Sequence, residues 1–155
     1  MSLRHTWLAA ALLAASSFVA ADEPRIQYLK PEGLFNVPSF SQVTVARPGT
    51  LVFVSGQISW DENGRMLAGD LRAQTEATFE NLKIALAATG ATFDDVAKLT
   101  IYVKNLDTRK WREVSEVRSR YLSTERPPAS TMVGITSLVY DEALIEIEAY
   151  AVLDD

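Results

Sequence analysis

The sequence contains no cysteine and only one histidine, His5, among its 155 residues. Without cysteine the chain can form no disulfide, so its stability in an oxidising compartment would come from packing alone. His5 lies in an N-terminal segment with the features of a leader, and its removal would leave no imidazole. These absences exclude Ser-His-Asp and Cys-His nucleophile systems and the usual ligands of zinc and copper. Any reaction would therefore be one in which a carboxylate handles a water or a proton.

Residues 1–21 have the pattern of a secretory signal peptide. Arg4 supplies the positive start, nine consecutive Trp, Leu and Ala residues form the apolar run, and Val19-Ala20-Ala21 is a small-residue cleavage site. The apolar run is too short to span a membrane, although an uncleaved N-terminal anchor is an alternative interpretation. We expect a periplasmic or secreted protein that has no membrane association after cleavage, with residues 22–155 forming a single domain.

The mature chain is acidic. Without Arg4, 14 basic residues face 20 acidic ones, for a net charge of −6. Its densest basic stretch, residues 109–112, is short and is typical of a solvated helix face. Because binding through phosphates needs basic stripes, we expect no nucleic-acid partner.

Apolar periodicity predicts alternating strands and helices. Expected strands cover residues 42–46, 51–55, 97–104, 129–135 and 144–152, and expected helices cover residues 71–89 and a segment from Asp107 or Thr108 to the prolines at 127 and 128. The first two strands flank Arg47-Pro48-Gly49-Thr50, which predicts a hairpin. The second helix carries its periodic positions at Trp111, Val114, Val117 or Arg118, and Tyr121. The order of elements predicts an α+β fold with two helices on one face of a mixed sheet.

The last predicted strand has two unlike faces. Residues 145, 147, 149 and 151 form an apolar stripe suited to packing against the helices, whereas the alternate positions include Glu146 and Glu148. That second face is too apolar for bare solvent and too polar for a core, so it suits an oligomer interface that encloses small pockets. Carboxylates there would have raised pKa values. The alternative is a pair of solvated glutamates on an exposed sheet.

Four segments carry a resemblance to a known family. "LVFVSGQIS", "TFENLKIALAATGATFDDVAKLTIYVKNL", "RPPAST" and "IEIEAYAV" occur in the order and approximate spacing typical of the RidA family, also called YjgF/YER057c/UK114. The resemblance spans residues 43–152. It implies a chorismate-mutase-like α+β fold, a homotrimer and clefts between subunits. It also implies hydrolysis of enamines and imines, small-molecule substrates, to keto acids and ammonia without metal or cofactor.

The resemblance assigns roles to individual positions. Glu146 matches the glutamate that positions the catalytic water, and Ser55, Gly56 and Gln57 match the turn that shapes the cleft. A tyrosine of the family falls on Phe40. The family's carboxylate-binding arginine, in a P-A-R-S segment, falls on Ser130, which is followed by Thr131.

The serine at position 130 is a large change, because one neutral hydroxyl replaces a bidentate guanidinium. The resemblance therefore implies that imine acids are held poorly and that Ser130→Arg would strengthen carboxylate binding. Arg126 could lean into the cleft, although an arginine before two prolines is more typical of the surface. Two functions remain open. One is a hydrolase in which Glu146 holds the water and Ser130, Thr131 and the backbone near Gly56 donate hydrogen bonds, and the other is a trimeric ligand-binding or scaffold protein without turnover.

Overall fold

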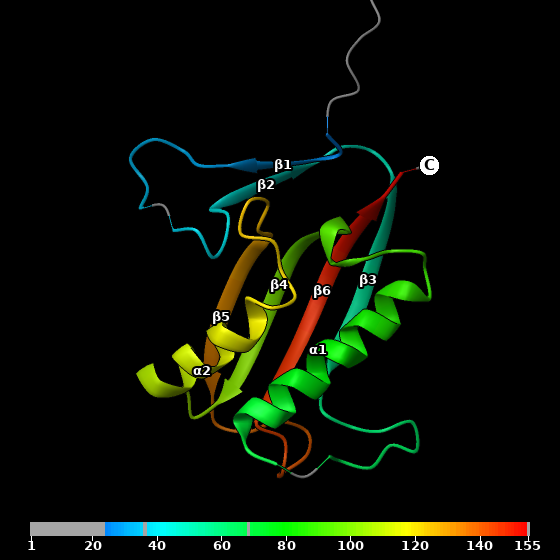
Figure 1. Cartoon of the computed structure of the whole chain (residues 1–155), viewed down its shortest axis with the longest axis vertical. Helices are drawn as coiled ribbons and strands as arrows, with labels where there is room; N and C mark the ends of the chain where they lie inside the picture. Colours follow the sequence, from blue (N-terminus) through cyan, green and yellow to red (C-terminus); the bar gives the residue numbers. More distant parts are fainter. Residues whose placement is uncertain (1–23, 36, 68, 155) are drawn as a thin grey trace, which may run out of the picture.

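A computed structural model describes residues 24–35, 37–67 and 69–154 of the chain. The predicted signal peptide, residues 1–21, lies outside the described residues. The regular elements are β1 (Ile26–Leu29), β2 (Val43–Ala46), β3 (Thr50–Gln57), α1 (Leu71–Ala87), the 3₁₀ turn η1 (Phe93–Asp95), β4 (Val96–Lys104), α2 (Thr108–Arg118), β5 (Ala129–Ile135) and β6 (Ile145–Leu153). Figure 1 shows both helices crossing in front of one sheet.

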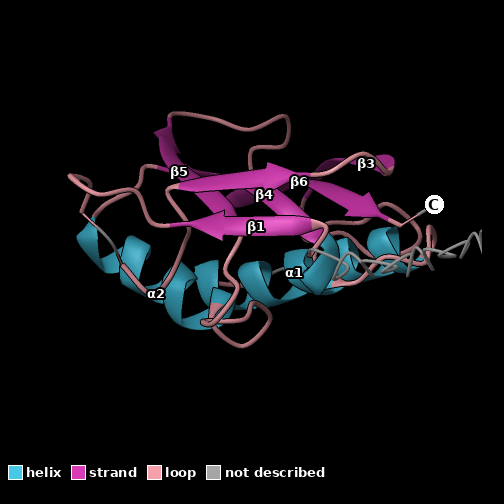
Figure 2. Ribbon diagram, turned by 90° about the horizontal axis from the view of Figure 1, so that it is seen from above, coloured by secondary structure: helices cyan, strands magenta, loops and turns pink. Residues whose placement is uncertain are grey.

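The main sheet has four strands in the order β3-β6-β4-β5. β6 is antiparallel to both β3 and β4, whereas β4 and β5 are parallel and are joined through α2. The view from above in Figure 2 shows both helices on one side of this sheet. The predicted α+β architecture, with two helices on one face of a mixed sheet, is confirmed.

The core lies between the helices and the sheet. The apolar stripe of β6 is fully buried, and so are its partners on β4, as predicted from the alternation of both strands. The core residues that these two strands contribute are Val96, Leu99, Ile101, Val103, Ile145, Ile147, Ala149 and Ala151. Phe79, Leu82 and Leu86 of α1 and Val114 and Val117 of α2 cover them.

Local capping signals fix where the helices begin. Asp70 accepts a hydrogen bond from the backbone N–H of Ala73 at 3.0 Å, and Asp107 accepts one from Lys110 at 2.7 Å. Each is an N-cap that satisfies a free donor of the first turn. α2 ends at Arg118 rather than at the prolines, so the prediction that the prolines end this helix is wrong. The residues between Arg118 and Pro127 form turns and bends instead.

The predicted hairpin of β2 and β3 is also wrong. β2 pairs with β1 in a separate two-stranded ribbon, and β3 pairs with β6 at the far end of the chain. Gly49 lies where the chain passes from the ribbon to the sheet, and a Cβ there would come within 2.3 Å of the Leu153 carbonyl oxygen. Residues 47–49 thus connect the ribbon to the sheet and do not join two paired strands. No helix in the described ranges is long and apolar enough to span a membrane.

Candidate active site

Glu146 lies in the middle of β6, on the sheet face opposite the helices. Its neighbours along the strand, Ile145 and Ile147, point into the core, so its own side chain points away from the core. A Cβ added to Gly56 would come within 1.8 Å of the Glu146 Oε1 atom. Any side chain at position 56 would therefore displace the carboxylate, and the glycine gives it room against the backbone of β3.

A β-bulge brings Gly56 to this position. Val54 pairs with Ala149 and Gln57 pairs with Ile147, so Ser55 and Gly56 together oppose one residue of β6. A bulge of this kind bends the strand and redirects its side chains, as is common beside active sites. Gln57 donates a hydrogen bond from Nε2 to the Ser55 carbonyl oxygen at 3.1 Å, so this bond lies within the bulged segment of β3.

The environment of Glu146 favours its protonated form. Partial burial raises the pKa of this carboxyl, and the negative charge of Glu148 raises it further. Tyr102 lies opposite Glu146 on β4 and donates a hydrogen bond to Glu148 Oε1 at 3.4 Å. Burial lowers the pKa of Lys98 on the same face, while Glu148 opposes that shift. The open face of the sheet thus carries a half-buried acid suited to accepting and returning a proton.

Ser130 lies on the other face. It pairs with Leu99 across the parallel ladder, and Leu99 is fully buried under the helices. Its hydroxyl oxygen accepts a hydrogen bond from Arg118 Nη1 at 3.1 Å, and Arg118 Nη2 donates to the Ser39 carbonyl oxygen at 2.5 Å. We call the group formed by Ser39, Arg118 and Ser130 the edge half-site, because β5 is an edge strand of the sheet.

Phe40 lies next to the edge half-site. The next residue, Ser41, forms a parallel bridge with Ala129, and the Ser41 hydroxyl donates a hydrogen bond to the Pro127 carbonyl oxygen at 2.7 Å. Position 40 is thus held beside the start of β5, close in the chain to Ser39. Thr131 alternates with Ser130 and lies on the open face, where it accepts a hydrogen bond from Lys98 Nζ.

The predicted site residues therefore form two groups. Ser55, Gly56 and Gln57 lie with Glu146, whereas Phe40 lies with Ser130. β4 separates β6 from β5, so Glu146 and Ser130 are two strand spacings apart across the sheet, about 10 Å, and they lie on opposite faces. They are also offset along the strands, because Glu146 pairs with Tyr102 of β4 whereas Ser130 pairs with Leu99. One copy of the chain does not bring Ser130 and Glu146 to the same small molecule.

Arg118 was not among the predicted site residues. The helical spacing of α2 left open whether Val117 or Arg118 faces inward, and both are buried. The signal that could have identified Arg118 was a cation at a predicted core position, since arginine is almost never fully buried without a partner.

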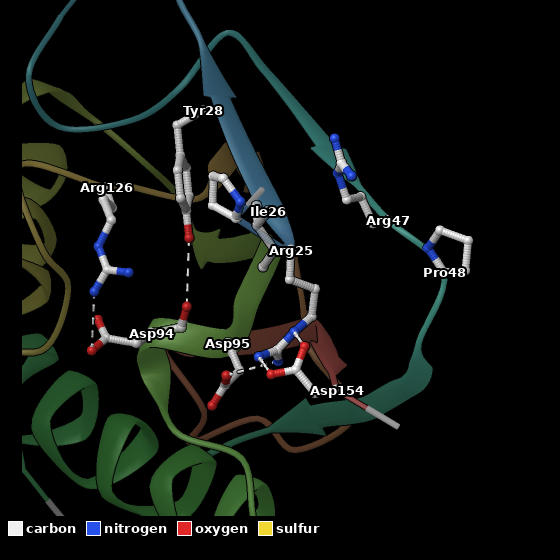
Figure 3. A pocket seen from close by; sticks show the side chains of 10 residues that line it. Arg25, Ile26, Tyr28, Arg47, Pro48, Asp94, Asp95, Arg126 and Asp154 are labelled. Atoms are coloured by element: carbon white, nitrogen blue, oxygen red, sulfur yellow. Dashed lines mark hydrogen bonds and ion pairs between the residues drawn. The ribbon is translucent and has the colours of Figure 1, made fainter. Parts of the chain in front are cut away.

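A cavity of about 500 Å³ lies elsewhere, where the β1–β2 ribbon meets η1 and the end of β6. Its lining residues include Arg25, Tyr28, Asp94, Arg126 and Asp154, and Figure 3 shows Arg126 pointing toward Asp94. Arg25 forms ion pairs with Asp95 and Asp154, and Arg126 pairs with Asp94 at 3.4 Å. The exposed Arg126 is thus engaged on the surface, away from Glu146.

Comparisons with known proteins agree with the fold and the order of motifs. The family model described as "Endoribonuclease L-PSP" matches residues 34–153. A RutC family protein of Pyrococcus abyssi is 40% identical over 104 residues, which are 66% of this chain and 79% of the relative. A protein of Dermatophagoides farinae named 2-iminobutanoate/2-iminopropanoate deaminase is 30% identical over 107 residues, which are 68% of this chain and 80% of the relative.

Solved structures give the same result. The crystal structure of a Rid-family protein of unknown function from Yersinia pestis superposes with a TM-score of 0.78 at 33% identity, covering 84% of this chain and 100% of that one. The crystal structure of Rv2704 from Mycobacterium tuberculosis, a YjgF/YER057c/UK114 member, gives a TM-score of 0.56 at 37% identity over 74% of this chain and 86% of that one. With the family model covering most of the sequence, this chain belongs to the endoribonuclease L-PSP family, which includes the RutC and RidA proteins.

Proposed function

We propose that the protein hydrolyses a small imine or enamine without a cofactor, with Glu146 as the residue that positions and activates water. The observation that carries this proposal is the Glu146 carboxylate, half-buried against Gly56 with a raised pKa. A relative from Dermatophagoides farinae, named for 2-imino acid deamination, supports the reaction class.

The chemistry requires only one proton-handling group. The water oxygen bonds to the carbon of the C=N group while Glu146 accepts a proton from that water. The carboxyl then returns this proton to nitrogen, which gives a carbinolamine. In the second half Glu146 accepts the proton of the new hydroxyl and passes it to the amine, so the C–N bond breaks as C=O forms and the products are a carbonyl compound and ammonia. A carboxyl whose pKa lies above its ordinary value is a stronger base for the first step and remains a usable acid for the second.

We propose further that the site lies between copies of the chain in a homotrimer. The open face of the sheet carries exposed apolar side chains, with Phe53 and Tyr150 in edge-to-face contact at 5.5 Å. A monomer would leave this patch in water. A second copy packed there would also supply the residues of the edge half-site that Glu146 lacks in its own chain.

The test uses protein that begins at Asp22 and imines generated in solution, with ammonia and carbonyl product measured together.

Glu146→Gln should lower the rate of imine hydrolysis by a factor on the order of 10² to 10⁴, because it removes the proton acceptor and keeps the shape of the side chain. Glu125→Gln, on an exposed loop, is the matched control and should keep the full rate. Gly56→Ala should lose activity through displacement of the Glu146 carboxylate. Equal rates in Glu146→Gln and the unmodified protein would contradict this function, and binding without turnover would indicate a ligand-binding or scaffold role.

We propose that the protein acts outside the cytoplasm, in the periplasm or after secretion. The support is the signal-peptide pattern of residues 1–21. Expression of the full chain in a Gram-negative host should give a mature product that begins at Asp22 by intact mass. A cytoplasmic product that retains Met1 would contradict export.

A further inference from the structure

A smaller cavity, of about 280 Å³, lies between α1 and the loop that follows β3. The residues that line it include Gln57, Trp60, Asp61, Glu62, Asn81 and Ile84. Asn81 of α1 joins the two walls, because its Nδ2 atom donates hydrogen bonds to the carbonyl oxygens of Ile58 at 2.8 Å and Trp60 at 3.0 Å. The loop is therefore held against the helix, and the cavity is part of the folded structure.

Two amide groups of the cavity present oxygen atoms that lack a donor. Gln57 uses its Nε2 atom to donate to the Ser55 carbonyl oxygen, and Asn81 uses its Nδ2 atom for the two bonds to the loop. Among the described residues, no donor reaches Gln57 Oε1 or Asn81 Oδ1. Each of these oxygens can accept two hydrogen bonds. A molecule that entered the cavity would therefore be held best if it carried N–H or O–H donors.

The cavity also carries negative charge that its surroundings do not neutralise. The Oδ1 atom of Asp61 accepts hydrogen bonds from the backbone N–H groups of Asn63 and Arg65, both at 2.9 Å, so the loop holds this carboxylate in place. Glu62 follows directly and is exposed. Neither carboxylate forms an ion pair within the described ranges. Since two like charges lie together at one cavity, a cation bound there would gain Coulomb energy from both.

Trp60 and Ile84 make the remaining wall apolar. The Trp60 ring is supported by Tyr140, with ring centroids 5.7 Å apart and an interplanar angle of 69°. Ile84 is 68% exposed, so a large apolar side chain on α1 meets water in the empty cavity. An alkyl chain laid against Ile84 would remove that surface from water, and an indole ring attracts a cation over its face. The cavity thus combines an apolar wall with negative charge and free acceptors.

We propose that this cavity binds a small organic cation with N–H donors and an alkyl chain, such as a primary alkylammonium or an alkylguanidinium. The carboxylates of Asp61 and Glu62 supply the complementary charge, and the two amide oxygens accept the N–H groups. The alkyl chain lies against the apolar wall. The site is separate from the proposed hydrolysis, because Glu146 does not line the cavity. Glu146→Gln should therefore bind the cation with unchanged affinity, so the two proposals fail independently.

The experiment uses the fluorescence of Trp60. Protein that begins at Asp22 has two tryptophans, Trp60 and the half-exposed Trp111, so Trp111→Phe leaves an indole only at the cavity. This protein is titrated with n-butylammonium and with n-butanol, which has the same shape without the charge. Butylammonium should give a saturable change and bind about 10-fold or more tightly than butanol, because its hydrogen bonds are charge-assisted. Butyltrimethylammonium, a cation without N–H groups, should bind more weakly than butylammonium.

Variants in the same background separate charge from shape. Asp61→Asn combined with Glu62→Gln keeps the side-chain shapes and should lose the preference for butylammonium over butanol. Glu62→Gln alone changes only an exposed side chain, so it tests the same point if the double variant does not fold, and it should reduce the preference several-fold. Glu125→Gln removes a charge that does not line the cavity and should keep the full preference. Ile84→Ala should weaken both ligands by a similar factor. The proposal is overturned by the absence of a saturable response, by equal affinity for butanol or butyltrimethylammonium, or by an unchanged preference in Glu62→Gln.

Discussion

The two faces of the four-stranded sheet are built from alternate residues of the same strands, yet they differ in almost every physical property. Toward the helices, Leu99, Ile101, Ile145 and Ile147 are fully buried and apolar. On the open face, Tyr102, Glu146 and Glu148 lie half-exposed, and after burial the charge of Glu148 raises the pKa values of Tyr102 and Glu146. One face supplies the free energy of folding, and the other holds charge in positions where folding gains little from it. Such a division lets the site change without loss of the core.

The largest effect should come from the helix-covered face. Ile147→Ala removes a fully buried side chain and should lower the free energy of unfolding by about 2–5 kcal/mol. Glu148→Ala, one position along on the open face, should change it by less than about 1 kcal/mol. Urea denaturation of both variants measures the contrast. Similar losses in the two would mean that the faces do not differ in the way described.

The second prediction concerns the association of the open face. Phe53 is 69% exposed in the single chain, and Phe53→Glu should dissociate the proposed homotrimer, since a charge buried in an interface without a partner costs several kcal/mol, roughly 3–5. Ile84 on α1 is 68% exposed, so Ile84→Glu is a control of matched exposure away from this face. Light scattering gives the masses. Dissociation by Ile84→Glu alone, or a monomeric unmodified protein, would contradict the assembly.

The smallest effect should be the pH dependence that Glu146 contributes. Its pKa is raised in the folded protein by burial and then by Glu148, so the folded state binds this proton more tightly than the unfolded state. Stability should therefore fall as pH rises from the unfolded carboxyl pKa, about 4.3, through the raised folded value, and stay lower above it. Glu146→Gln should remove this decline. Urea midpoints compared across this range measure it, and parallel curves for the two proteins would show no such contribution.

The sequence was a good guide wherever a property depends on neighbouring residues in the chain. Alternation in residues 145–151 predicted which side chains of β6 enter the core, and Asp70 marked the start of α1. Pairing partners were harder. The turn after Ala46 has the composition of a hairpin, but Thr50 pairs with Leu153, and local composition contains no information about a partner so far along the chain.

The candidate site shows the same limit. Family motifs identified Glu146 and Gly56, and the structure gives the physical reason that they occur together, because only glycine leaves room for that carboxylate. The contact between Arg118 and Ser130 joins a helix end to a strand, and it depends on how α2 packs over β5. Helical periodicity could not choose between Val117 and Arg118 as the inward residue, since both positions face the sheet.

The bulge at Ser55 and Gly56 makes the room beside Glu146 independent of the register of the core. Because two residues there oppose one of β6, deletion of Ser55 would return the ladder to regular pairing and still leave Gln57 opposite Ile147. The rest of β3 would keep its register, and the core would be unaffected. The backbone that makes room for the Glu146 carboxylate, however, would move. A change of one residue in the length of β3 can therefore open or close the space beside Gly56 that the Glu146 carboxylate occupies, while the fold persists. The activity of such a protein could change without any substitution in its core.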